Sequence, residues 1–218
     1  MGSFLIIGMG RFGSSVALEL SRMKHEVLAV DEFEENIADI ANRLTNVIIG
    51  DAKDEAVLRS LGVQNFDCVV VATAGNIEDS ILITMMLREL GAKEIVCNAQ
   101  NERHAKILTL LGANRVIRPE FDMGRRVAYS LGHYNLIDYL EISPEYGIME
   151  MSTPEHWADK SLGKNNLRMK YGVTVIAIRD AATKSINSKP NANTVLSRGD
   201  IITVFGSNAD LEAISDIR

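Results

Sequence analysis

Short apolar runs alternate with longer helix-like stretches over the first 117 residues of the chain. Runs such as 69–71 are apolar at every position, which is typical of parallel strands covered on both faces. The stretches between the runs carry apolar residues at helical spacing, as at Ile81, Met85 and Leu90. The predicted strands are Phe4–Ile7, Glu26–Val30, Val47–Ile49, Cys68–Val71, Glu94–Cys97 and Arg115–Ile117.

A leucine, a glycine and a small apolar residue follow one another at 61–63, 90–92 and 111–113, where predicted helices end. Glycine at such a position closes a helix in the left-handed conformation, and the next apolar residue packs back onto it. The chain then enters the next strand within a few residues. This repeated strand–helix order predicts an α/β fold, a Rossmann-like doubly wound parallel sheet.

The pattern changes after Ile117. A turn at 118–120 precedes a predicted helix over 121–134, whose apolar positions form a wider stripe than one core needs. This helix either crosses to a neighbouring subunit or packs on its own sheet. The stripe consists of Met123, Val127, Leu131 and Tyr134.

A small α+β region follows from about Tyr139. We expect strands at 146–151, 173–178 and 201–205, helices at 161–170 and 208–214, and a polar loop at 184–193. The prediction is therefore two domains. Residues 1–134 form an N-terminal nucleotide-binding domain with its crossover helix, and residues 135–218 form a C-terminal α+β regulatory domain.

The composition is that of a soluble globular protein of 218 residues with a net charge of −6. No basic stripe offsets this charge, so nucleic acid is not an expected partner. No apolar run reaches the length of a membrane span, and no signal-peptide pattern opens the chain. Cys68 and Cys97 lie in apolar runs, as expected for buried thiols in a reducing cytoplasm.

The first strand runs directly into the motif Gly-x-Gly-x-x-Gly at Gly8, Gly10 and Gly13. In such a unit one glycine turns the chain, one lets the backbone approach a diphosphate, and one lets the helix pack on the strand. Phe12 starts the apolar face of the following helix. Free N–H groups at the helix start favour phosphates. The motif therefore predicts a nucleotide site.

Two charged residues extend this prediction. Asp31 ends the second strand at the spacing of a ribose-binding carboxylate, which disfavours a 2′-phosphate. Arg11 lies in the first helical turn, where it either contacts a phosphate beyond the diphosphate or is simply solvated.

Small and polar residues end the third and fourth strands at the same edge of the sheet. Asp51, followed by Ala52, either bonds an adenine amino group or caps the helix that starts near residue 54. Ala72 permits close approach of a nucleotide, and Thr73 either joins it or caps the next helix. The sequence shows no positioned acid–base group for hydride transfer, because its four histidines are scattered. A small NAD-dependent oxidoreductase and a redox-sensing transcription regulator are the alternatives to a non-catalytic nucleotide-binding protein.

Several motifs together resemble the regulatory (RCK domain) subunits of bacterial Trk/Ktr potassium-uptake systems, close to the KtrA type. The resemblance covers essentially the whole chain. The matching stretches are 7–13, 25–31, 50–52, 99–101, 112–113, 118–120, 122–124 and 171–173.

The resemblance implies a nucleotide-sensing, non-catalytic subunit at the inner face of the cell membrane. Homodimers would assemble into an octameric ring that gates a membrane-embedded potassium-translocating partner. ATP and ADP, or NAD and NADH, would bind at the glycine loop, with Arg11 on the terminal phosphate and Asp31 on the ribose. Glu120 would help to hold a divalent cation.

The resemblance also implies a second ligand, cyclic di-AMP, in the C-terminal domain. Its expected contacts are Arg168, Thr174, Val175, Ile176 and Pro190.

Overall fold

The computed structural model describes residues 1–73 and 75–217, and the chain divides into two compact units, 1–120 and 121–218. The predicted domain boundary at 134/135 lies beyond this division, because most of the predicted crossover helix belongs to the second unit. No helix of the described residues is both long and apolar enough to cross a membrane.

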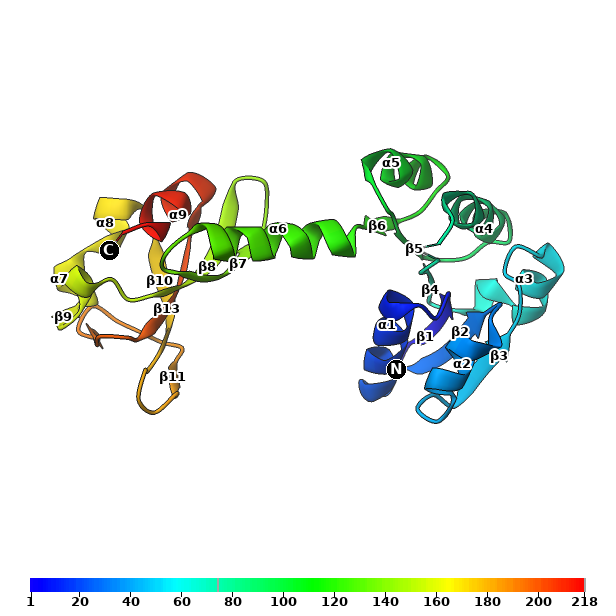
Figure 1. Ribbon diagram of the computed structural model, residues 1–218, viewed down its shortest axis with the longest axis horizontal. Coiled ribbons are helices and arrows are strands. Elements are labelled where there is room, and N and C mark those ends of the chain that lie inside the picture. Colours follow the sequence, from blue (N-terminus) through cyan, green and yellow to red (C-terminus); the bar gives the residue numbers. More distant parts are fainter. Residues whose placement is uncertain (74, 218) are drawn as a thin grey trace. The chain divides into compact units, whose positions relative to one another are not determined.

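The first unit is a six-stranded parallel sheet flanked by helices (Figure 1). Its strand order, β3-β2-β1-β4-β5-β6, reverses direction between β1 and β4, as in a doubly wound fold. The predicted α/β class and Rossmann-like sheet are confirmed. The elements are β1 (Ser3–Ile7), α1 (Arg11–Arg22), β2 (Glu26–Asp31), α2 (Glu34–Ala41), β3 (Asn46–Ile49), α3 (Glu55–Leu61), a 3-10 turn (Val63–Asn65), β4 (Cys68–Val71), α4 (Ile77–Glu89), β5 (Ile95–Asn98), α5 (Glu102–Leu110) and β6 (Arg115–Ile117).

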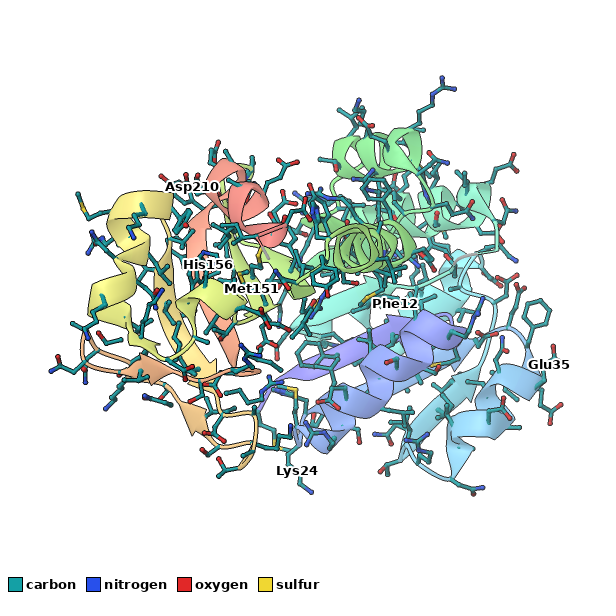
Figure 2. All side chains as sticks on the ribbon, turned by 60° about the vertical axis from the view of Figure 1, so that its left-hand side comes forward. Phe12, Lys24, Glu35, Met151, His156 and Asp210 are labelled. Atoms are coloured by element: carbon teal, nitrogen blue, oxygen red, sulfur yellow. The ribbon has the colours of Figure 1, made fainter. Side chains whose placement is uncertain are left out.

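Successive strand residues point to opposite faces of this sheet and enter two separate cores. In β1, Leu5 and Ile7 pack with α3, α4 and α5, whereas Ile6 packs with α1 and α2. Both faces are therefore covered, which explains the unbroken apolar runs. Charged side chains such as Lys24 and Glu35 project outward from the unit (Figure 2).

Glycine closes the helices as the sequence predicts. Gly62, Gly91 and Gly112 all have positive φ, at 66°, 77° and 100°. The two thiols are buried as predicted, and burial raises the pKa of Cys68 and of Cys97 to about 11. Both thiols therefore remain protonated at neutral pH and act as core residues.

The second unit is built on a five-stranded antiparallel sheet of order β11-β10-β13-β8-β7, with a small β12–β9 pair beside it. Its core includes the fully buried Trp157, Met151 and Ile202. The elements are α6 (Pro119–Gly132), β7 (Leu136–Glu141), β8 (Tyr146–Ser152), a 3-10 turn (Glu155–Trp157), β9 (Lys160–Ser161), α7 (Leu162–Asn165), α8 (Leu167–Tyr171), β10 (Thr174–Arg179), β11 (Ile186–Asn187), β12 (Val195–Leu196), β13 (Ile201–Ser207) and α9 (Asn208–Ser215).

Several details differ from the sequence prediction. The expected helix over 161–170 is two short helices, because Asn166 adopts a left-handed conformation with φ of 51° and breaks it. Strand β7 was not predicted, and the expected polar loop at 184–193 contains the short strand β11.

Helix α6 buries none of its residues, and Leu131 remains 81% exposed. Within the second unit, ion pairs to β7 hold it in place, Arg126 with Asp138 and Arg125 with Glu141. The other residues of the apolar stripe, Met123, Val127 and Tyr134, are exposed as well. Whether a second subunit covers it stays a prediction.

Candidate functional site

A cleft of about 480 Å³ opens at the carboxyl edge of the parallel sheet, beside the ends of the neighbouring strands β1 and β4, where the strand order reverses. This size lies within the range of small-molecule sites, and the location is the one at which open α/β sheets bind ligands. The cleft gathers almost every residue that the sequence predicts for the site. These are Gly8, Gly10, Arg11, Phe12, Asp31, Asp51, Ala52, Ala72, Thr73 and Glu120.

The three glycines occupy distinct environments. Gly8 has a φ of 94°, and a Cβ there would lie 3.0 Å from the backbone of Ala72 and Thr73. A Cβ on Gly13 would lie 1.9 Å from the carbonyl oxygen of Gly8, so this glycine lets α1 pack on the loop. Gly13 supports the cleft and does not line it.

Gly10 differs from both, because a Cβ at this position would meet no described atom within 4 Å. Gly10 is the N-cap of α1, and its side-chain position opens into the cleft. The first turn of α1 holds no acidic residue that would compete with a bound anion. The residues present therefore fit a diphosphate at the start of α1.

Asp31 is buried and ties the glycine loop to the end of β2. Its Oδ2 accepts a hydrogen bond of 2.6 Å from the backbone N–H of Met9. Its Oδ1 accepts bonds from the N–H of Phe33 and the side-chain amide of Asn36, at 2.9 and 3.1 Å. The carboxylate thus shapes the loop and also faces the cleft, where its remaining lone pairs can accept ribose hydroxyls.

Residues other than Asp51 and Thr73 cap the helices that follow β3 and β4. Asp54 caps α3, and its carboxylate accepts from the N–H of Ala56. Asn76 caps α4. Asp51 instead accepts from the N–H of Lys53 at 2.9 Å, and the buried hydroxyl oxygen of Thr73 has no hydrogen-bond partner among the described residues. Both residues are thus left facing the cleft. Ala74 lies outside the described residues.

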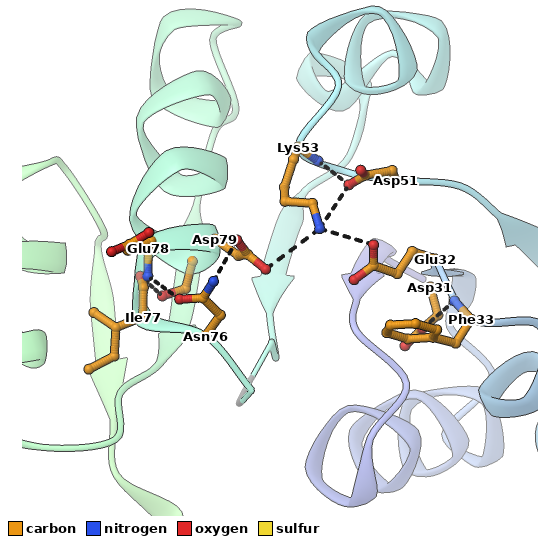
Figure 3. A network of polar contacts seen from close by, with 10 residues as sticks. Asp31, Glu32, Phe33, Asp51, Lys53, Asn76, Ile77, Glu78 and Asp79 are labelled. Atoms are coloured by element: carbon orange, nitrogen blue, oxygen red, sulfur yellow. Dashed lines mark hydrogen bonds and ion pairs between the residues drawn. The ribbon is translucent and has the colours of Figure 1, made fainter.

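Lys53 joins three acidic residues at one end of the cleft (Figure 3). Its Nζ lies 2.9 Å from Glu32, 3.6 Å from Asp51 and 3.6 Å from Asp79. The hydrogen bond to Glu32, followed by the charges of Asp51 and Asp79, raises the pKa of Lys53. The lysine therefore stays charged at neutral pH.

The sequence analysis missed five polar residues that line the cleft: Glu32, Asn36, Lys53, Asn76 and Asp79. Each follows a predicted strand or begins the next helix at the ligand-binding edge. Their position next to a strand end or a helix start is the sequence feature that could have identified them.

Glu120 is exposed and lines the cleft. Among the described residues, no group of three or more His, Cys, Asp or Glu side chains could hold a metal ion. Glu120 could therefore supply one ligand, with phosphate oxygens completing the coordination sphere.

The residues predicted for the second ligand lie on α8, on β10 and in the loop between β11 and β12. Val175 packs against the core of the second unit, whereas Arg168, Thr174 and Ile176 are exposed and Pro190 is half-buried. Their role in binding cyclic di-AMP stays a prediction.

The topology and the cleft define a Rossmann-like domain joined to a small antiparallel one, and sequence comparison identifies the family. The TrkA-N domain family matches residues 4–119, and the TrkA-C domain family matches residues 148–217. The chain belongs to the TrkA-N/TrkA-C family, together with the Ktr system potassium uptake proteins.

Two relatives come from Bacillus subtilis (strain 168). Ktr system potassium uptake protein C is 39% identical over 95% of this chain and 93% of its own length. Ktr system potassium uptake protein A is 40% identical over 96% of this chain and 93% of its own length.

Among solved structures, the GsuK channel bound to NAD matches with a TM-score of 0.71 at 20% identity. The match covers 98% of this chain and 38% of the GsuK chain, so it supports the fold alone. GsuK bound to ADP matches with a TM-score of 0.54 at 21% identity, covering 59% of this chain and 34% of the other.

Proposed function

We propose that this protein is a nucleotide-sensing regulatory subunit of a membrane potassium transporter. The single observation that carries the proposal is the cleft over β1 and β4. It is lined by Gly10, Arg11 and Asp31 and leaves free space next to Gly10. The near full-length relation to Ktr system potassium uptake proteins supports the potassium role.

The proposed ligand is ATP or ADP, with NAD and NADH as the alternative pair. Solved structures of similar fold include proteins bound to NAD, ADP and AMP. The diphosphate would lie at the start of α1, the ribose at Asp31, and the adenine near Asp51. Arg11 has no ion-pair partner among the described residues, which leaves its charge available to a terminal phosphate.

The regulatory step needs two shapes of an assembly with different affinities for the ligands, because a ligand shifts an equilibrium only by its differential binding. ATP and ADP differ by one phosphoryl group, and in this proposal Arg11 binds the phosphate that only ATP carries. A divalent cation between Glu120 and the phosphates would strengthen the distinction. We propose that the assembly is an octameric ring of homodimers at the cytoplasmic face of its membrane partner. We assign the cleft no catalytic role.

Native mass spectrometry tests the nucleotide and assembly parts of this proposal together. The purified protein is measured alone and with ATP, ADP, NADH or cyclic di-AMP. An octamer that retains one nucleotide per subunit is expected, and a monomer that retains none would contradict the proposal.

Complementation tests the potassium part. Expression in Bacillus subtilis lacking Ktr proteins A and C is expected to restore growth at low potassium. Steady oxidation of NADH by the purified protein on a substrate panel would favour the oxidoreductase alternative instead.

A further inference from the structure

The cleft is strongly acidic for a site that takes an anion. The charged residues that line it are five acidic ones and two basic ones among the described residues: Asp31, Glu32, Asp51, Asp79 and Glu120 against Arg11 and Lys53. A nucleotide carries several negative charges of its own. The question is therefore how the acidic end of the cleft tolerates such a ligand.

Lys53 is the only cation at that end among the described lining residues, because Arg11 lies at the phosphate end on α1. The carboxylates around Lys53 come from three separate segments: the end of β2, the end of β3 and the first turns of α4. Figure 3 shows the ammonium group between Glu32 on one side and Asp79 on the other. Lys53 thus bridges the walls of the cleft.

We propose that Lys53 is a positioning residue for nucleotide binding, which holds Glu32, Asp51 and Asp79 together and offsets their charge at the ribose and base end of the cleft. Without this cation, the three carboxylates repel one another. The walls then separate, and the base loses its packing between them. The inference rests on the proposed nucleotide function and identifies a determinant of affinity within that site.

The position of Lys53 gives the proposal a distinct signature. Because the bridge acts at the ribose and base end, its removal weakens AMP, ADP and ATP by the same factor. A lysine that contacts phosphate would instead weaken each nucleotide more as phosphates are added.

The test is calorimetric titration of the full chain with AMP, ADP and ATP. Lys53→Met keeps the length of the side chain and removes its charge. We expect affinity to fall about tenfold for all three nucleotides, as for the loss of a cation from a shared, partly desolvated network. Lys53→Arg, which can still bridge carboxylates, should retain most of the affinity.

Lys93→Met is the matched control, since Lys93 pairs with Asp67 at 3.6 Å in the same unit and does not line the cleft. It should bind all three nucleotides as the wild type does. Thermal melting checks that each variant folds.

A double variant distinguishes the effect of the lost charge from damage to the fold. Asp79→Asn in the Lys53→Met background removes one of the repelling charges and should recover part of the lost affinity. Damage to the fold would not be repaired by this second change.

Wild-type affinity for AMP in Lys53→Met would overturn the inference, and so would a loss that grows with phosphate number. Equal weakening by Lys93→Met would also overturn it. If the wild type binds none of the three nucleotides, the proposed function itself fails, and this result is distinct from every outcome above.

Discussion

Alanine at Gly10 and alanine at Gly13 should separate ligand binding from folding within one motif. A Cβ at Gly10 meets no described atom within 4 Å, and the φ of −63° suits alanine. A Cβ at Gly13 would lie 1.9 Å from the Gly8 oxygen and 2.9 Å from the Cβ of Ala72. The first methyl occupies the space for a diphosphate, whereas the second forces α1 away from the glycine loop.

The magnitudes follow from these contacts. Gly13→Ala moves packed backbone by more than an ångström and should cost about 3 kcal/mol of unfolding free energy, at the upper end of overpacking. Gly10→Ala should change stability by less than about 1 kcal/mol, because an N-cap glycine is a modest contributor. Its effect should fall on nucleotide affinity, by at least about a hundredfold, since the backbone can no longer approach the phosphates.

Urea unfolding followed by circular dichroism measures the first effect, and calorimetric titration with ADP measures the second. Each variant serves as the control for the other. Gly10→Ala that binds ADP normally would refute the phosphate assignment. Gly13→Ala with wild-type stability would refute the packing argument.

Three further outcomes are expected. Arg11→Ala should weaken ATP more than ADP in calorimetry, and equal losses would reject its contact with the terminal phosphate. Burial lowers the pKa of His104 from its usual 6.5, and its Nδ1 accepts from the N–H of Gln100 at 3.2 Å. Since the unfolded histidine then binds protons more readily, the free energy of unfolding should fall as pH drops below about 6.5, and His104→Gln should flatten this dependence. The hydrogen bond from Arg126 lowers the pKa of Asp138. The contribution of this pair to the free energy of unfolding should therefore be complete above the usual pKa of aspartate and be lost as the pH falls below about 4. An unchanged acid unfolding curve in Asp138→Asn would contradict this.

The first unit was predictable because its strands are buried on both faces. Such strands read as unbroken apolar runs, and the glycine that closes each helix marks the return to the sheet. The glycine motif and Asp31 were predictable for a similar local reason, because each lies at a fixed distance from a strand end.

The second unit was harder to predict because its elements depend on tertiary partners. Strand β7 carries Asp138 and Glu141, which pair with arginines of α6. No local feature of the sequence predicts that pairing. The left-handed Asn166 likewise interrupts a stretch with good helical spacing, at little cost for asparagine.

In the site, residues at strand ends were predictable, and the Lys53 network was not. Its carboxylates come from three segments that are far apart in the sequence and meet only in the folded sheet. Spacing along the chain does not reveal such a meeting point.

A crystal structure of the protein grown with ADP and ATP in parallel tests the central claim most directly. The account predicts the diphosphate over the N–H groups that follow Gly10, with the third phosphate of ATP at Arg11 and a different arrangement of subunits in the two crystals. A cleft without nucleotide at millimolar concentration, or one identical arrangement with both ligands, would contradict it.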